Sequence, residues 1–417
     1  MVLSRTARII CPSFWKGFKS SKSHLPFITA GNGEHKALTT SSNLWYPRGV
    51  RPKVQRSKQS GYVEQVQSWN FSEEEEKGEA AKTEEETELH KPVMLEEIMS
   101  IFQPSDNQVF LDMTFGAGGH TKAILQSNSL TKVYALDRDP VAHRLASKLA
   151  DKYKSRVFPL LGRFTDLDKL LKDAAVQHQS FDGVLIDAGC SSMQFDNPER
   201  GFALSEDGPL DMRMDGSRVP STPSAADVVN NLDAQTLARI IRTYGEERLA
   251  KKIAAMIVDY REKHKPIETT AELATVISFA FTHRAAADSK DSLGRKLHVA
   301  TRTFQALRIF VNDELNELHH ALHTIKPYLK KGGKLAVLTF HSLEDRIVKR
   351  FLQGKNVNEK GKSLHERKRS HDWTTDEEEL KSPDWQIVNK KVLCASEFEV
   401  SQNPRSRSAK LRAAFKL

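Results

Sequence analysis

The sequence predicts an α/β protein in which a parallel sheet with crossover helices is interrupted by a helical insertion. Short apolar runs alternate with segments of helical periodicity, as expected of consecutive βαβ units. A glycine-rich turn follows the first of these runs. A long stretch, residues 203–301, is rich in helix formers and contains no convincing strand. Together these observations favour one sheet-based core that an all-helical segment divides in two.

The predicted strands are short, and their apolar residues are nearly continuous. Such runs are typical of strands buried on both faces of a parallel sheet. Three of the five end in an aspartate, which the sheet would deliver to its carboxyl edge. The strands are Val109 to Asp112, Val133 to Asp137, Val157 to Leu161, Val184 to Asp187 and Leu335 to Phe340.

The flanking segments complete the predicted core. Order is expected to begin near His90, where apolar residues recur at roughly helical spacing. After the insertion, apolar residues from Phe304 to Leu329 recur at steps of three and four, which predicts one long amphipathic helix. Residues 385–393 and 408–415 are expected to form a hairpin-like pair of strands. The polar segment 354–383, which precedes this pair, is predicted to be a mobile loop.

The N-terminal region has the composition of a targeting segment. Residues 1–60 contain one acidic residue, Glu34, among many arginines, lysines, serines and threonines. This composition is typical of a mitochondrial presequence, and a basic tail that binds nucleic acid is the alternative. Residues 61–89, dominated by glutamate from 73 to 88, are predicted to be a disordered acidic linker.

Bulk composition limits the classes of function. The chain has 417 residues and a formal net charge of +9, which favours an acidic partner without choosing between nucleic acid and membrane. No run approaches the roughly 18 to 20 apolar residues of a membrane span. Cys11, Cys190 and Cys394 lie far apart and lack a histidine at ligand spacing. We therefore expect neither a disulfide framework nor a metal site.

The segment VFLDMTFGAGGHTKAIL, which begins at Val109, has the pattern of a strand, a glycine-rich turn and a helix start. Gly116, Gly118 and Gly119 would let the backbone approach a ligand closely. The helix N-terminus beyond them favours a carboxylate or a phosphate. By itself the turn is compatible with a nucleotide-type cofactor or with a tight connection.

Asp137 makes a nucleoside cofactor the better interpretation. It ends the next strand, about 20 residues after the turn, where a carboxylate can accept hydrogen bonds from both ribose hydroxyls. The turn lacks a phosphate-binding Lys-Ser/Thr pair, so a cofactor without phosphates is favoured, and S-adenosylmethionine fits. Alternatively, Asp137 caps the following turn. Asp112 could bind the cofactor's ammonium group or brace the glycine loop.

Two further strand ends extend the predicted cleft. Phe164, just after the third strand, could lie against the adenine face or belong to the core. Asp187 ends the fourth strand and is followed by Ala-Gly-Cys-Ser-Ser-Met-Gln194, so it brings polar groups to the carboxyl edge. We expect the substrate to bind on this side.

Several ordered blocks carry a family likeness. They are TFGAGGH, ALDRDP, DAGCSSMQFD, ERGF, DGPLDMRMD, TYGEER, ATRTFQALRI, FHSLEDRIVKRF and NPRSRSAKLR. Over residues 90–417 the chain resembles the RsmH/MraW family of ribosomal RNA cytosine N4-methyltransferases. With its presequence-like leader, it resembles the mitochondrial member of that family. The chain departs from the usual pattern at Cys190, Met193 and Val299, which affects fine loop shape only.

The resemblance implies a Rossmann-like class I methyltransferase core, residues 90–202 and 302–417, with the insertion 203–301 as substrate domain. It implies S-adenosylmethionine as cofactor and a cytidine of mitochondrial small-subunit (12S) ribosomal RNA, free or in an assembly intermediate, as target. The expected location is the mitochondrial matrix. The implied cofactor contacts are Gly118, Gly119, His120, Asp137, Phe164, Asp187 and Gln194.

The chemistry of the target selects candidates for the base pocket. The exocyclic amine of cytosine is a poor nucleophile, so hydrogen-bond acceptors on its protons and a held near-attack geometry would assist transfer. Asp187, Asp211, Arg213 and His341 are the catalytic candidates. Alternatively, Asp211 and Arg213 form an internal ion pair, and His341 orients the turn before the next helix.

RNA binding is expected to use positive charge, with the target base unpaired or extruded. A non-catalytic ribosome assembly factor and a small-molecule methyltransferase are the rival interpretations. The intact glycine turn and Asp137 argue against the first, and the large insertion and basic charge argue against the second. The candidate phosphate contacts are Arg295, Lys296, Arg302, Arg405, Arg407, Lys410 and Arg412.

Overall fold

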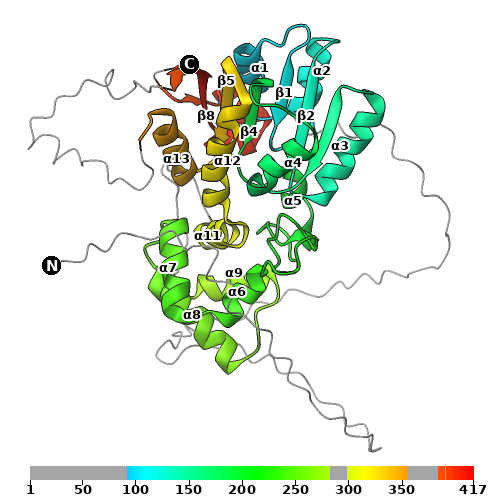
Figure 1. The fold of residues 1–417 in the computed structure, drawn as a ribbon. Helices are drawn as coiled ribbons and strands as arrows, with labels where there is room; N and C mark the ends of the chain where they lie inside the picture. The colour runs from blue at the N-terminus through cyan, green and yellow to red at the C-terminus, as the bar shows by residue number, and fades with distance from the viewer. Residues whose placement is uncertain (1–91, 282–297, 356–383, 390) are drawn as a thin grey trace, which may run out of the picture. The chain divides into compact units, whose positions relative to one another are not determined.

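The computed structural model describes residues 92–281, 298–355, 384–389 and 391–417 (Figure 1). The predicted presequence and acidic linker lie outside the described residues, as do Arg295, Lys296 and all but the first two residues of the predicted loop 354–383. Within the described ranges, none of the helices combines the length and apolarity needed to cross a membrane.

The predicted α/β architecture is confirmed. The strands form one sheet in the order β3-β2-β1-β4-β5-β8-β6, and β7 also pairs with β8. Strands β1 to β5 run parallel, and β8 runs antiparallel to β5, β6 and β7. The strand bounds are β1 Val109–Asp112, β2 Lys132–Asp137, β3 Val157–Leu161, β4 Phe181–Asp187, β5 Leu329–Thr339, β6 Trp385–Ile387, β7 Leu393–Cys394 and β8 Lys410–Lys416.

The C-terminal strands differ from the expected simple pair. Strand β6 does pair antiparallel with β8, but it ends at Ile387, and Leu393–Cys394 pairs with β8 at a separate place. Strand β8 lies between β5 and β6 and so completes the sheet. The C-terminus is thereby fixed to the edge of the parallel strands.

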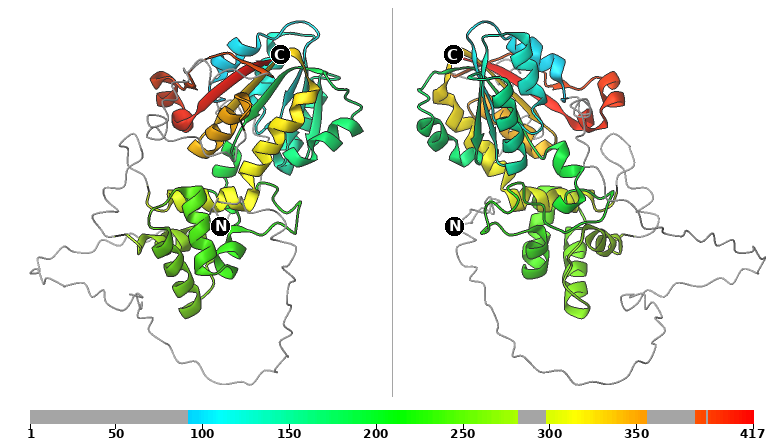
Figure 2. Two further views of the ribbon diagram at one scale, coloured as in Figure 1. Left: turned by 60° about the vertical axis from the view of Figure 1, so that its left-hand side comes forward. Right: turned by 90° about the vertical axis from the view of Figure 1, so that its right-hand side faces the viewer.

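Helices cover both faces of the sheet (Figure 2). Helices α1 (Leu95–Phe102), α2 (Gly119–Ser127) and α3 (Pro140–Lys152) pack on one face, around Phe110 and Leu185. Helices α4 (Leu167–Asp173), α12 (Glu314–Tyr328) and α13 (Ser342–Leu352) pack on the other, around Leu111 and Ile186. Adjacent residues of one strand thus enter opposite cores, which explains the nearly continuous apolar runs.

The described part of 203–301 is helical from Ala225 onwards, as expected, whereas residues 203–224 form turns and irregular structure with an isolated bridge between Pro209 and Thr269. Its helices are α6 (Ala225–Asn231), α7 (Ala234–Gly245), α8 (Ala250–Lys263) and α9 (Thr270–Ser278), and α11 (Thr301–Asn312) follows. Helix α7 packs on α8 and α11, and α8 packs on α9. The short elements near the sheet are η3 Phe164–Asp166, α5 Ser192–Phe195, η4 Pro198–Arg200, α16 Glu397–Gln402 and η5 Pro404–Ser408.

The prediction of one long helix after the insertion is wrong. Helix α11 ends at Asn312, Asp313 takes a left-handed conformation with φ of 51°, and α12 begins at Glu314. The buried Asn312 amide donates to the carbonyl of Met212 (2.7 Å) and accepts from the amide of Met214 (2.8 Å). These contacts anchor the break to the segment that enters the insertion. The apolar periodicity continues because both helices bury a face.

Candidate functional site

A cavity of about 540 Å³ lies at the carboxyl edge of the parallel strands. Its lining comes from the segments that follow β1, β2, β3, β4 and β5, from α11 and α12, and from η5. A volume of this size suits a small-molecule ligand. The sheet therefore brings together the strand ends that the sequence singled out.

Asp112 stabilises the glycine-rich turn through hydrogen bonds to residues on both sides of it. It is buried, and its carboxylate accepts from the Thr114 amide (3.1 Å) and the Thr121 hydroxyl (2.7 Å). Burial raises its pKa, and these hydrogen bonds oppose that shift. Asp112 is not among the residues that line the cavity. Of its two expected roles, the geometry supports bracing.

The glycines of the turn serve different purposes. Gly116 has φ of 54°, lines the cavity and donates its N–H to Asp137 Oδ2 (2.8 Å). A Cβ on Gly118 would lie 2.6 Å from the Phe115 ring, and one on Gly119 would lie 2.3 Å from Pro92. Gly119 also lines the cavity, whereas Gly118 does not. In this structure glycine at 118 is a packing requirement and its cofactor contact stays a prediction, whereas Gly116 is half-buried and has room around its Cβ position.

Asp137 stands at the end of β2 and lines the cavity. Its second oxygen accepts from the amide of Asp139 (2.8 Å). Each oxygen already has one backbone donor and keeps a further lone pair, so it can also accept a hydroxyl. Burial raises its pKa to about 6, which leaves the carboxylate mostly ionised at neutral pH. The capping role and the ribose role expected from the sequence are thus compatible.

The remaining predicted cofactor residues, His120, Phe164 and Gln194, all line the cavity. His120 Nε2 lies 3.0 Å from the carbonyl oxygen of Val93, and burial lowers the pKa of this imidazole. Phe164 is partly buried and packs against the core.

Gln194 is held by local hydrogen bonds at the cavity wall. Its oxygen accepts from the Ser191 amide (3.1 Å), and its amide nitrogen donates to Asp139 (2.9 Å). Gln194 therefore shapes the wall as the partner of Ser191 in the capping box of α5.

Asp187 offers an unused acceptor to the cavity. Its amide donates to the Thr114 hydroxyl (2.7 Å), but its Oδ1 is buried and has no hydrogen-bond partner among the residues that the structure describes. Burial, reinforced by the carboxylates of Asp112 and Glu344, raises the pKa of Asp187 to about 8. A buried acceptor without a partner is costly, so a ligand that donates to it would be favoured.

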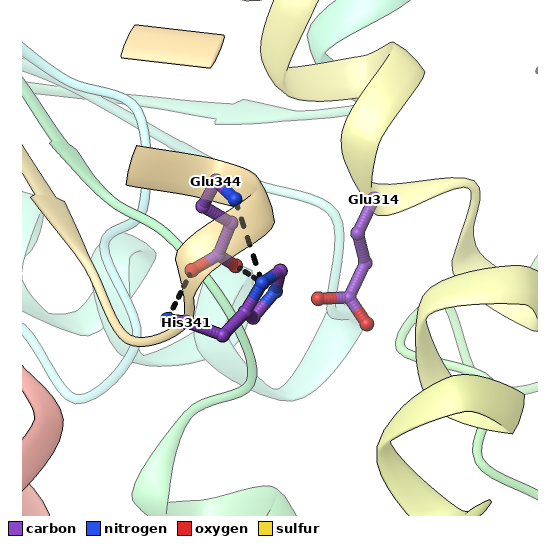
Figure 3. A group of neighbouring side chains, drawn as sticks. All are labelled: Glu314, His341 and Glu344. Carbon is purple, nitrogen blue, oxygen red and sulfur yellow. Dashed lines mark hydrogen bonds and ion pairs between the residues drawn. The ribbon is translucent and has the colours of Figure 1, made fainter. Parts of the chain in front are cut away.

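The other three catalytic candidates are not among the cavity-lining residues. Asp211 and Arg213 form an ion pair of 2.6 Å. His341 caps α13, and its Nε2 lies 2.9 Å from Glu344 Oε1 (Figure 3). These contacts match the structural alternatives stated above, and a catalytic role for the three stays a prediction.

A cluster of charged residues beside Asp187 was missed by the sequence reasoning. Arg308 lines the cavity and makes two 2.8 Å contacts with the carboxylate of Glu314, which also lines it. Glu344 accepts from the amides of Phe340 (2.8 Å) and His341 (3.2 Å) and lines the cavity too. The blocks ATRTFQALRI and FHSLEDR contain two of these residues, but their spacing does not reveal the contact.

Asp215 is a second charged centre that was missed. Its carboxylate is fully buried and contacts the guanidinium groups of Arg138 (2.5 Å), Arg163 (2.7 Å) and Arg218 (2.5 Å). Arg138 directly follows Asp137, and Arg163 directly precedes Phe164; both line the cavity. Asp215 therefore ties the segment entering the insertion to the two loops that carry the predicted ribose and adenine contacts.

The candidate phosphate contacts fall into two groups. Arg405 and Arg407 of η5 line the cavity, and Arg405 also pairs with Asp196. The others are engaged elsewhere: Arg412 pairs with Asp345 at 2.7 Å, Lys410 lies 3.9 Å from the same carboxylate, and Arg302 lies 3.9 Å from Glu247.

The lining fits a nucleoside with an amino-acid tail. A carboxylate at Asp137 can receive ribose hydroxyls, Phe164 offers an aromatic face, and Gly116 leaves the turn open. Asp187 also lines the cavity, and a donor that reached its unpartnered Oδ1 would satisfy it. The donor set therefore suits the predicted cofactor together with a substrate group.

Residues 87–417 match the model of the MraW methylase family. The human "12S rRNA N(4)-cytidine methyltransferase METTL15" is 53% identical over 339 residues, covering 79% of this chain and 83% of that protein. The "Ribosomal RNA small subunit methyltransferase H" of Parvibaculum lavamentivorans is 46% identical over 328 residues, covering 78% of this chain and 88% of that protein. A Drosophila melanogaster "Probable methyltransferase-like protein 15 homolog" is 46% identical over 336 residues, covering 79% of this chain and 93% of that protein.

Proposed function

The chain belongs to the MraW methylase family, and from this premise we propose that it uses S-adenosylmethionine to methylate N4 of a cytidine in small-subunit ribosomal RNA. The single observation that carries the proposal is the position of Asp187. Asp187 lines the cavity together with Asp137 and the glycine turn, and its buried Oδ1 has no hydrogen-bond partner among the described residues. An acceptor for an amine and a site for a nucleoside cofactor thus share one cleft.

The cofactor is assigned to the first three strand ends. Asp137 accepts the ribose hydroxyls, Phe164 covers the adenine, and the turn at Gly116 and Gly119 receives the amino-acid end. When bound, S-adenosylmethionine supplies an electrophilic methyl group on a cationic sulfonium. Glu317 and Glu344 line the same cavity and provide negative charge that favours a cation there.

Asp187 acts on the target amine. Its Oδ1 would accept a hydrogen bond from the N4 amino group, which would orient the nitrogen and favour the pyramidal form that attacks the methyl group supplied by bound S-adenosylmethionine. The methylated amine must lose a proton, and a carboxylate with a pKa near 8 can receive it at mildly basic pH, where it is ionised. Phe340 also lines the cavity and adds an apolar surface to it.

The RNA is assigned to the open side of the cleft. Arg405 and Arg407 line the cavity and are placed to contact phosphates, while the target base leaves its stack to reach Asp187. We assign the insertion, residues 203–301, to substrate binding.

The basic, acid-poor composition of residues 1–60 and the 12S rRNA named for the human relative support action in the mitochondrial matrix, on the 12S rRNA of an assembling small subunit.

Two measurements test the proposal. Titration of the purified protein with S-adenosylmethionine should show saturable binding at one site. Mass spectrometry of mitochondrial small-subunit rRNA from cells lacking the protein should show loss of N4-methylcytidine at one position. Undiminished N4-methylcytidine in these cells would refute the substrate assignment, and absence of cofactor binding would refute the enzyme assignment.

A further inference from the structure

Arg308 on α11 lies against the loop that follows Asp187. Its Nη2 is 3.9 Å from the position that a Cβ on Gly189 would occupy, and its Nη1 is 3.4 Å from the sulfur of Cys190. Arg308 and Asp187 both line the cavity. The structure thus places a guanidinium group and an unpartnered carboxylate oxygen on the same wall.

The guanidinium group of Arg308 is held in a fixed orientation. Nε and Nη2 donate to the two oxygens of Glu314, each at 2.8 Å, and the Arg308 side chain is 14% exposed. Among the described residues, Nη1 contacts only the Cys190 sulfur, which is a weak acceptor. Nη1 is therefore an oriented and poorly satisfied donor on a side chain that lines the cavity.

An acceptor beside a donor matches the Watson–Crick edge of cytosine. Cytosine presents the N4 amino donor next to the N3 acceptor, whereas uracil presents an O4 acceptor next to an N3–H donor. A site that pairs a carboxylate with a guanidinium would leave both of its groups unpaired against uracil. The same arrangement is how guanine selects cytosine.

We propose that Arg308 is a specificity-determining residue that donates from Nη1 to N3 of the target cytosine while Asp187 accepts from N4. This inference rests on the proposed function and assigns the recognition of the base to that site. Glu314 is then a positioning residue, because its carboxylate orients the guanidinium group.

The same neighbourhood contains atoms that a metal ion could use. Ligand atoms of Glu314, His341 and Glu344 lie within 4.8 Å of one another (Figure 3). Both oxygens of Glu314 are already engaged by Arg308, however, and its positive charge would repel a cation at that position. The contacts therefore favour the anchoring of Arg308 over metal binding.

A chemical double-mutant cycle tests the Arg308 contact. The substrate is an oligonucleotide of mitochondrial small-subunit rRNA that the wild-type protein methylates, and in a second version 3-deazacytidine replaces the target cytidine, which removes the N3 acceptor. We expect this replacement to lower kcat/KM of the wild-type protein roughly 10- to 100-fold. The Arg308→Met variant should have a kcat/KM on cytidine that is lower than that of wild type by a similar factor. On 3-deazacytidine its kcat/KM should fall by no more than about twofold further.

A binding readout accompanies the cycle. In the presence of S-adenosylhomocysteine, the wild-type protein should bind the cytidine oligonucleotide more tightly than the same oligonucleotide with uridine, and Arg308→Met should bind both equally. Arg144→Met, an exposed arginine on α3, is the matched control and should behave as wild type. Because Arg308→Met leaves Glu314 unpaired, the double variant Arg308→Met/Glu314→Gln repeats the cycle if the single variant unfolds.

The possible outcomes separate the two claims. If 3-deazacytidine lowers kcat/KM by the same factor in wild type and in Arg308→Met, the role of Arg308 is overturned while the methyltransferase function stands. Activity that is lost on chelation and restored by Zn²⁺ or Mg²⁺ would overturn it in favour of a metal site. A wild-type protein that forms no N4-methylcytidine would instead contradict the proposed function itself.

Discussion

Replacing Asp215 by asparagine removes the charge at the centre of three arginines. The carboxylate is fully buried and contacts Arg138, Arg163 and Arg218. Burial alone would raise its pKa, but the charges and hydrogen bonds of Arg138 and Arg163 outweigh burial and lower it to about 2 from 3.8. Asparagine keeps the shape of the side chain and leaves the three guanidinium groups without their counter-charge.

The pKa of Asp215 sets the size of the effect. A shift of about 1.8 units, at roughly 1.36 kcal/mol per unit, corresponds to about 2.4 kcal/mol. Removing one partner of a buried ion pair typically costs about 3 to 5 kcal/mol. We therefore expect Asp215→Asn to lower the free energy of unfolding by about 2 to 4 kcal/mol at pH 7.

Urea denaturation followed by circular dichroism measures this loss. The folded pKa lies below the unfolded value, so the stabilisation is complete above pH 4 and disappears as the pH falls from 4 towards 2. The difference in free energy of unfolding between wild type and Asp215→Asn should therefore be the same at pH 5 and pH 7 and smaller near pH 3. Asp259→Asn, which breaks an exposed pair with Lys263 on α8, is the control and should change stability by no more than about 0.5 kcal/mol. A loss below about 0.5 kcal/mol for Asp215→Asn at pH 7 would refute the reasoning.

Three further variants test other parts of the site. Asp137→Ala should weaken S-adenosylmethionine binding about 10- to 100-fold in calorimetry, because two ribose hydrogen bonds to a charged acceptor are lost; unchanged affinity would remove Asp137 from the site. Asp187→Asn should lower kcat at least about 100-fold and abolish a rise of wild-type kcat with pH through about 8. Because its folded pKa lies above its unfolded value, ionised Asp187 destabilises the fold increasingly from pH 4 to 8, so the variant's gain in melting temperature should be larger at pH 8 than at pH 5; the opposite trend would contradict the raised pKa. Gly245→Ala should cost about 1 to 3 kcal/mol, since its Cβ would lie 2.3 Å from the Arg302 carbonyl oxygen of α11; a neutral result in thermal unfolding would show that α7 and α11 can separate there.

Local patterns were sufficient to predict which strand ends line the cavity. The glycine turn and Asp137 are separated by one crossover helix, so their spacing along the chain fixes their meeting at the sheet edge. The same logic places Asp187 there, one strand further along the sheet. These residues follow from strand order and from the common direction of parallel strands.

The charged contacts could not be predicted in the same way. Arg138 and Asp215 are 77 residues apart, and Arg308 meets Cys190 across 118 residues. Such pairs depend on how the insertion and α11 pack against the core, and no local periodicity encodes that packing. The break at Asp313 was missed for the same reason, because Asn312 is fixed by Met212 and Met214, about 100 residues away.

The most direct test of the central claim is to locate the transferred methyl group. The purified protein is incubated with S-adenosylmethionine carrying a deuterated methyl group and with mitochondrial small-subunit rRNA, and the nucleosides are then analysed by fragment mass spectrometry. The proposed arrangement around Asp187 predicts the label on N4 of a single cytidine, and its loss with Asp187→Asn. A label on a ring carbon or on the ribose, or no label despite cofactor binding, would contradict it.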